Sequence, residues 1–211
     1  MTAQVRYIGV ARDPRDVALS WDNHFDNMNI PVFLRLRDRA VGLDDLAELM
    51  PDGIPVRLDS ELERFWQWVD DPTPVDQTLT GLASTLHHLT TFRRERERHN
   101  IVLLHYGDLK ADLEGQMRSL ASRLQIDVPE ERWPEFVDAA TFEQMRARAG
   151  EVGPNNTESI WLDAARFFNK GTSGQWRHLL GDDELRRYEA RTRELADAAV
   201  LSWVHQGPIT A

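Results

Sequence analysis

Apolar residues along the chain form two short runs and many helically spaced positions. The two runs are Val5–Ala11 and Ile101–Tyr106. Neither alternates with polar residues, which is typical of parallel strands that are covered on both faces. Most other apolar positions recur every three or four residues, the spacing of one helix face. The pattern therefore predicts an α/β domain with few strands and many helices.

Signals for helix ends follow both strands. Asp13 and Pro14 predict the cap and first turn of a helix directly after the first strand, with Asp16 in the capping-box position. Asp108 is the predicted cap after the second strand. Gly150–Gly174 is predicted to be irregular, and loops of that length tend to be functional or disordered. Further helices are predicted over 32–41, 43–49, from Ser60 to the Asp71-Pro-Thr-Pro74 break, and over 76–99, 109–124, 130–139, 142–149 and 183–203.

Two strands are few for an α/β domain. A pair of parallel strands is not a stable sheet by itself. The first strand has the composition of a central strand, yet it begins only four residues into the chain. We therefore expect residues 1–211 to form a single domain that corresponds to the later portion of a larger α/β domain.

Charge and composition exclude several kinds of partner. The 25 basic and 35 acidic residues give a net charge of −10, which argues against broad contact with nucleic acid or an anionic membrane. Any anion site must therefore be local. No apolar run is long enough for a signal peptide or a membrane span.

Residue types also restrict the chemistry. The chain has no cysteine, which excludes disulfides and thiolate ligands and is ordinary for the cytoplasm, where we expect the protein. The histidines lack metal-ligand spacing, so no metal is expected. Of the 25 basic residues only Lys110 and Lys170 are lysine, a bias that we interpret as codon usage.

The first candidate anion site follows the first strand. Arg12 leaves the strand at the edge where ligands gather in open α/β sheets, and Ser20 lies about two turns into the next helix. A guanidinium can donate two parallel hydrogen bonds to a phosphate. The alternative is that Arg12 bonds local carbonyl groups and that Ser20 bonds back into its own helix.

The second candidate is the late loop, which we define as Phe167–Trp176. It places Lys170 beside Gly171 and Gly174, so that backbone N–H groups could form an anion nest, with Trp176 anchoring the loop. The alternative is an ordinary glycine turn with an apolar plug. Neither a G-x-x-x-x-G-K-[ST] nor a G-x-S-x-G motif is present.

Four segments in order resemble motifs of the sulfotransferases that use 3′-phosphoadenosine 5′-phosphosulfate (PAPS). Tyr7–Ser20 resembles the 3′-phosphate-binding motif, Val102–Lys110 the Tyr-Glu-Asp-(Met/Leu)-Lys segment, and Ala140–Met145 the Thr-Ser-Phe-x-x-Met segment. Phe168–Trp176 resembles the R-K-G-x-x-G-D-W loop. Gly153–Trp161 is similar to a pattern of bacterial, mycobacterial glycolipid sulfotransferases. The resemblance, which runs from about residue 5 to 207, implies a P-loop-NTPase-like parallel sheet with flanking helices.

The resemblance also implies roles for particular residues. Arg12 and Ser20 would bind the 3′-phosphate of the cofactor, and Lys170 and Gly171 would close over it. Tyr106 would contact the nucleoside, and Phe142 would lie beside the adenine.

Two positions depart from the family pattern. Asn169 occupies the position of a cofactor-binding arginine and removes one cation, for which nearby Arg166 is the candidate replacement. Gln175 replaces the usual acidic residue before Trp176, so that a contact which braces the loop is in question.

The implied activity is sulfuryl transfer from PAPS to a hydroxyl of a small-molecule or glycolipid acceptor, which leaves 3′,5′-ADP. In the family the phosphosulfate loop and the catalytic histidine precede the Arg12 motif, so we expect both to be missing here, and the catalytic residues stay unassigned. The alternative is a non-catalytic nucleotide-binding or interaction module. A nucleotide kinase fits less well, because the late loop has no role there.

The sequence specifies neither the acceptor nor the oligomeric state. Aromatic residues between 28 and 74 suit an apolar acceptor and a hydrophobic core equally well; they are Phe33, Phe65, Trp66 and Trp68.

Overall fold

The computed structural model describes residues 5–41, 57–78, 80–154 and 158–206. The predicted helix over 43–49 lies outside these ranges. The strands are β1 (Tyr7–Ala11) and β2 (Ile101–His105). The α-helices are α1 (Pro14–Asp26), α2 (Ile30–Val41), α4 (Glu61–Val69), α5 (Leu82–Arg94), α6 (Tyr106–Ala111), α7 (Leu113–Leu124), α8 (Trp133–Ala139), α9 (Phe142–Ala147), α10 (Ala149–Val152), α11 (Ala164–Phe167), α12 (Asp182–Leu195) and α13 (Ala198–Gln206). Short 3₁₀ turns cover Glu130–Arg132 and Gln175–His178.

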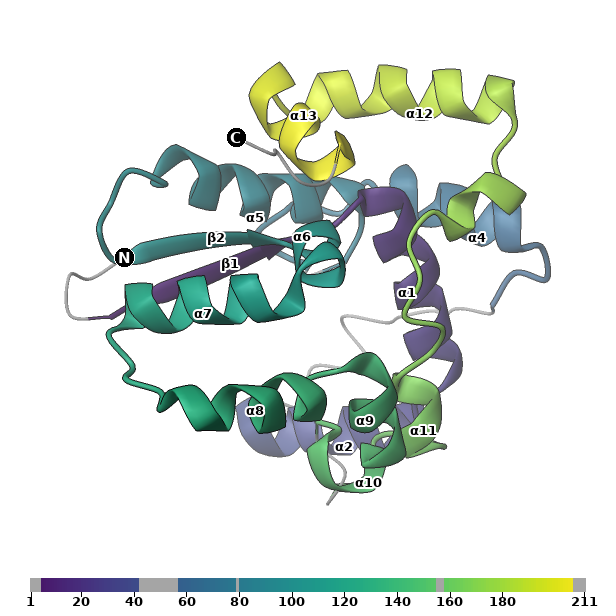
Figure 1. Cartoon of the computed structure of the whole chain (residues 1–211). Coiled ribbons are helices and arrows are strands. Elements are labelled where there is room, and N and C mark those ends of the chain that lie inside the picture. The colour runs from purple at the N-terminus through teal and green to yellow at the C-terminus, as the bar shows by residue number, and fades with distance from the viewer. Residues whose placement is uncertain (1–4, 42–56, 79, 155–157, 207–211) are drawn as a thin grey trace.

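The two predicted strands pair in parallel. Their register runs from Tyr7 opposite Ile101 to Ala11 opposite His105. The strands lie between α5 and α7 (Figure 1). A Cβ atom on Gly9 would come within 2.9 Å of the Phe92 ring of α5, so that glycine permits this close approach. The pairing places the carboxyl ends of both strands, where α1 and α6 begin, at one edge.

One expectation about β1 is wrong. The strand is not covered on both faces, because Ile8 and Val10 are 42% and 51% exposed. Within the described residues, β2 is the only strand that pairs with β1.

Local capping groups decide where the helices begin and end. Asp13 caps α1 and Ser60 caps α4, as predicted. The cap after β2 is His105 instead of Asp108: its Nδ1 accepts a hydrogen bond from the Gly107 N–H. Asp112 then caps α7, so the predicted helix over 109–124 is divided in two.

Two further helices are shorter than predicted. The helix over 76–99 begins only at Leu82, because the preceding Gly81 has a left-handed φ of +88°, and it ends at Arg94. The helix over 183–203 is interrupted by extended backbone at Ala196. Asp197 then accepts a hydrogen bond from the Val200 N–H at the start of α13.

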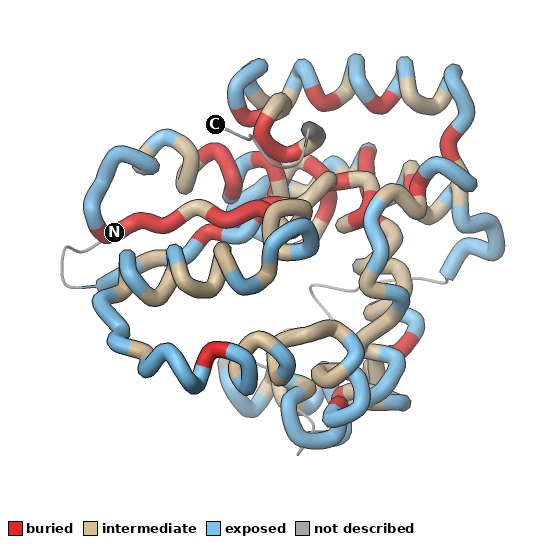
Figure 2. The backbone as a smooth tube through the Cα atoms, in the orientation of Figure 1, coloured by how far each residue is buried: buried red, intermediate tan, exposed pale blue. Residues whose placement is uncertain are grey.

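The hydrophobic core joins α1, α4, α5, α12 and α13 to the end of β1, as the buried stretches in Figure 2 show. Phe65 and Trp68 belong to this core, whereas Phe33 is exposed. Trp66 is partly buried, and the Arg187 guanidinium lies 3.7 Å from its ring centre. The largest apolar side chains that are fully buried are those of Tyr188, Leu82, Leu86, Val69, Val200, Val204 and Pro14.

Candidate functional site

One pocket of about 590 Å³ brings together all seven residues that the resemblance assigns to the cofactor. They come from the end of β1, from α1, from the starts of α6 and α9, and from the late loop. The residues are Arg12, Ser20, Tyr106, Phe142, Asn169, Lys170 and Gly171. The remaining lining residues are Leu109, Lys110, Leu113, Ala140, Thr141, Met145, Phe167, Phe168 and Gln175.

Arg12 connects β1 to the late loop. Its Nη2 donates a hydrogen bond of 3.0 Å to the Thr172 carbonyl, 160 residues away, so the alternative of a bond to local carbonyl groups is wrong. The guanidinium carbon lies 4.5 Å from the centre of the Tyr106 ring. The Nε atom is buried and has no protein partner. Arg12 therefore keeps a donor that a ligand could satisfy.

Two glycines shape the late loop. Gly171 has a left-handed φ of +63°, and a Cβ there would lie 2.7 Å from the Phe142 ring. Gly174 is also left-handed, with φ +79°. Trp176 anchors the loop as predicted, since it is 8% exposed and belongs to the core.

Asp16 fixes the end of the late loop. Its carboxylate is 2% exposed and accepts hydrogen bonds from the Gly174 N–H at 2.7 Å and the Gln175 N–H at 3.0 Å. The capping-box prediction for Asp16 is thus wrong, because the carboxylate faces the loop instead of its own helix. The Gln175 side chain adds a brace of its own, a 3.2 Å hydrogen bond to the Thr172 carbonyl.

The rest of the pocket wall is aromatic and apolar. The rings of Phe142 and Phe168 meet edge to face with their centres 6.3 Å apart. Tyr106 adds a third ring, and Leu109 and Met145 add aliphatic surface. A wall of this kind suits a flat, weakly polar group such as a purine.

The charges in this pocket are all positive. Arg12, Lys110 and Lys170 line it, whereas no aspartate or glutamate does. Among the described residues, no carboxylate forms an ion pair with any of these three cations. In a chain of net charge −10 this is a local concentration of unpaired positive charge. The pocket is therefore suited to an anion with an aromatic or apolar part.

Arg166 does not replace the missing cation at Asn169. Its Nη2 pairs with Asp26 at 2.6 Å, and this hydrogen bond lowers the pKa of the Asp26 carboxyl. Two further residues hold the late loop, Asp16 and Lys110. Their partners are 158 and 61 residues away, so no local spacing signals them.

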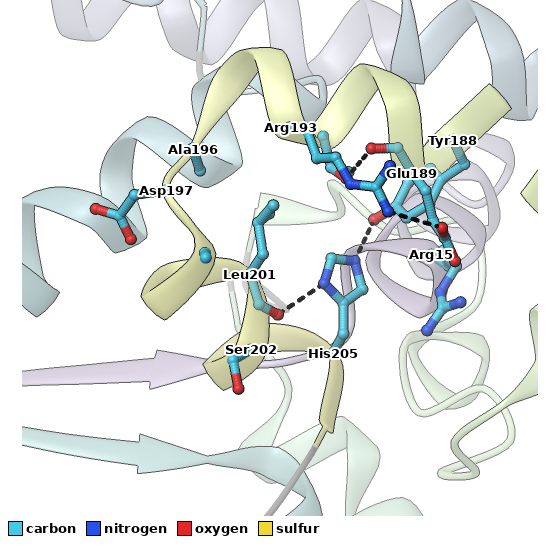
Figure 3. Close-up of a pocket in the computed structure, with 11 residues that line it drawn as sticks. Arg15, Tyr188, Glu189, Arg193, Ala196, Asp197, Leu201, Ser202 and His205 are labelled. Carbon is cyan, nitrogen blue, oxygen red and sulfur yellow. Dashed lines mark hydrogen bonds and ion pairs between the residues drawn. The ribbon is translucent and has the colours of Figure 1, made fainter. Parts of the chain in front are cut away.

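A second pocket, of about 650 Å³, lies between α12, α13 and the start of α1 (Figure 3). Its polar groups satisfy one another. Tyr188 donates from its hydroxyl to His205 Nε2 at 2.9 Å, and His205 Nδ1 donates to the Leu201 carbonyl at 2.8 Å. Arg193 pairs with Glu189 at 3.2 Å. These contacts indicate a structural role for this pocket.

We expect this region to weaken in mild acid. Burial lowers the pKa of His205 below 6.5 despite its hydrogen bond to the Leu201 carbonyl and the nearby Asp13 and Glu189. Burial also lowers the pKa of His24, which lies outside this pocket in the last turn of α1. A lowered pKa means that the unfolded state binds protons more readily, so stability is lost as the pH falls below 6.5 and is unaffected by these groups above it.

Urea unfolding at pH 5.5 and 7.5 measures this effect. His205→Gln should reduce the difference in unfolding free energy between the two pH values, whereas His87→Gln, at an exposed position of α5, should leave it unchanged. An equal difference in the wild type and the His205 variant would contradict the assignment.

Two kinds of feature are absent from the described residues. No described helix combines the length and hydropathy that crossing a membrane requires. No group of three or more potential metal-ligating side chains occurs in the described part of the chain.

The fold and the pocket define an α/β protein with a cationic, aromatic-lined site at the carboxyl ends of its two parallel strands. A family model described as "Sulfotransferase domain" matches residues 1–199. The glycolipid sulfotransferase of Mycobacterium bovis (strain BCG / Pasteur 1173P2) is 34% identical over 212 residues, which are 97% of this chain and 65% of that relative. The chain therefore belongs to the sulfotransferase family, and it spans about 65% of the length of this relative.

Solved structures show the same fold. Retinol dehydratase in complex with androsterone and inactive cofactor PAP has a TM-score of 0.65 at 21% identity, over 92% of this chain and 48% of that chain. Mouse sulfotransferase SULT7A1 complexed with PAP has a TM-score of 0.67 at 17% identity, over 96% of this chain and 64% of that chain. The predicted fold class is confirmed.

Proposed function

We propose that this chain provides the 3′-phosphoadenosine-binding part of a PAPS-dependent sulfotransferase. One observation carries the proposal: the seven residues assigned by resemblance line a single pocket whose charged side chains are all cations. The relatives support it, because the glycolipid sulfotransferase of Mycobacterium bovis and this chain belong to one family.

In the proposed complex, PAPS supplies the sulfuryl group that is transferred. Arg12 and Lys170 bind the 3′-phosphate with charge-assisted hydrogen bonds, to which Ser20 adds a hydroxyl donor. Gly171, because it lacks a side chain, lets the late loop lie directly against the Phe142 ring, which forms the proposed adenine side of the pocket. Asn169 contributes a neutral amide where the family pattern has a cation.

The base of the nucleotide occupies the aromatic side of the pocket. Phe142 packs against the adenine, and Tyr106 contacts the nucleoside while its ring also holds Arg12. Aromatic stacking of this kind binds a base without reading its hydrogen-bonding edge. 3′,5′-ADP and 5′-AMP differ only in the 3′-phosphate, so contacts to this group supply the selectivity for 3′,5′-ADP.

The acceptor in this proposal is a hydroxyl of a small molecule or a glycolipid. A relative is named for glycolipids, and a structural neighbour contains androsterone. None of the described histidines is assigned as the catalytic base. The proposal includes a bacterial origin and a cytoplasmic location, which suits a chain without cysteine. It also includes a single domain over residues 1–211, without nucleic acid as a partner.

Calorimetric titration of the whole chain with 3′,5′-ADP tests the proposal. We expect saturable binding that is at least about tenfold tighter than binding of 5′-AMP, because a charge-assisted hydrogen bond contributes about 1.5–3 kcal/mol. Absence of binding would overturn the proposal. Binding without sulfuryl transfer from PAPS to any hydroxyl acceptor would favour the non-catalytic module.

A further inference from the structure

The two lysines of the chain meet at one place. Of the 25 basic residues only Lys110 and Lys170 are lysine, and both line the pocket described above. We interpret the dominance of arginine elsewhere as codon usage. It does not explain why the two exceptions, 60 positions apart in the chain, come together in space.

Lys110 lies on α6 one turn after Tyr106, so the two side chains share a helix face. Its Nζ donates a hydrogen bond to the Gly171 carbonyl. The next carbonyl of the loop, that of Thr172, accepts from Arg12. The two strand ends therefore place two cations on adjacent carbonyl groups of the late loop.

A carbonyl oxygen accepts a hydrogen bond from a cation but does not neutralise its charge. Lys110 has no carboxylate partner among the described residues, and neither has Arg12. An ammonium has three donors on a flexible stem, so Lys110 can keep Gly171 with one N–H and offer the others to a ligand.

We propose that Lys110 is a further binding residue for the 3′-phosphate, and that it also positions Gly171 through the hydrogen bond to its carbonyl. This inference rests on the proposed function, because it concerns the same pocket. Lys110 then has two roles: it places a positive charge beside a phosphate monoester, and it holds the late loop.

Calorimetry on Lys110→Met separates charge from loop positioning. We expect affinity for 3′,5′-ADP to fall about tenfold or more, since a charge-assisted hydrogen bond is lost, while affinity for 5′-AMP changes less than about threefold. Lys110→Arg should restore most of the affinity for 3′,5′-ADP. Arg186→Met, which removes an exposed cation of α12 that pairs with Asp183, is the matched control and should leave both affinities unchanged.

The scarcity of lysine permits a second measurement. The side-chain amines of the chain are those of Lys110 and Lys170, so acylation by an amine-reactive ester followed by peptide mass spectrometry reports on each of them separately. Saturating 3′,5′-ADP should slow acylation of both lysines several-fold, whereas 5′-AMP should protect them less.

The outcomes are distinguishable. If the wild type binds 3′,5′-ADP and Lys110→Met weakens both nucleotides equally, Lys110 only holds the loop and the inference is wrong, while the proposed function stands. Unchanged acylation of Lys110 in the presence of bound 3′,5′-ADP would overturn it in the same way. If the wild type binds neither nucleotide, the proposed function fails and the inference fails with it.

Discussion

Replacing Arg12 with alanine is expected to reduce the affinity for 3′,5′-ADP by roughly 100-fold or more, because two charge-assisted hydrogen bonds contribute about 1.5–3 kcal/mol each. Arg12 reaches the late loop, stacks on Tyr106 and keeps a buried Nε without a protein partner. These features indicate a side chain that is held in place for a ligand.

Calorimetry on Arg12→Ala measures this loss, and a parallel thermal unfolding experiment shows whether the fold survives. We expect little loss of stability, because the single carbonyl that Arg12 holds, that of Thr172, is also bonded by the Gln175 side chain. Arg12→Lys keeps the charge without the planar fork and should bind with intermediate affinity. Unchanged affinity in the alanine variant would show that the 3′-phosphate lies elsewhere.

Asp16→Ala is expected to lower the free energy of unfolding by about 2–4 kcal/mol, the cost of leaving donors without a charged acceptor in the interior. The carboxylate is 2% exposed and accepts from two consecutive N–H groups, those of Gly174 and Gln175. No other side chain is bonded to those two N–H groups in the described structure. The end of the late loop should therefore lose its connection to α1.

Urea unfolding measures the loss for Asp16→Ala, and calorimetry with 3′,5′-ADP tests its effect on the pocket. Asp16→Asn retains one acceptor oxygen and should fall between the wild type and the alanine variant. Asp183→Ala, which removes an exposed carboxylate from the first turn of α12, is the control and should change stability little. If Asp16→Ala lowers the free energy of unfolding no more than the control does, the hydrogen bonds from Asp16 to the late loop do not stabilise the fold.

Local signals in the sequence predicted much of the secondary structure. Asp13 and Ser60 cap helices as expected, since a cap depends only on residues within one turn. The breaks at Asp112 and Ala196 were missed because helical periodicity continues across both of them. In the first case the deciding group is the Asp112 side chain, which accepts a hydrogen bond from the Gly115 N–H and caps α7.

The pocket was partly predictable for a topological reason. Parallel strands end at the same edge of a sheet, so Arg12 after β1 and Tyr106 after β2 had to lie close together. The late loop could be placed near them only by resemblance to the sulfotransferases. Arg166 lies near Asn169 in the chain but pairs with Asp26. Closeness in sequence therefore does not predict that its side chain enters the pocket.

The sequence by itself determined the two strands and the helix caps at Asp13 and Ser60, and its resemblance to the sulfotransferases indicated the residues that line one pocket. Only the tertiary structure decided how the late loop is held, since the carboxylate of Asp16 and the ammonium of Lys110 bond to backbone groups 158 and 61 residues away. Backbone N–H and carbonyl groups are the same at every position, so no residue type marks the ones that a distant side chain will bind. Tertiary folding alone selects them.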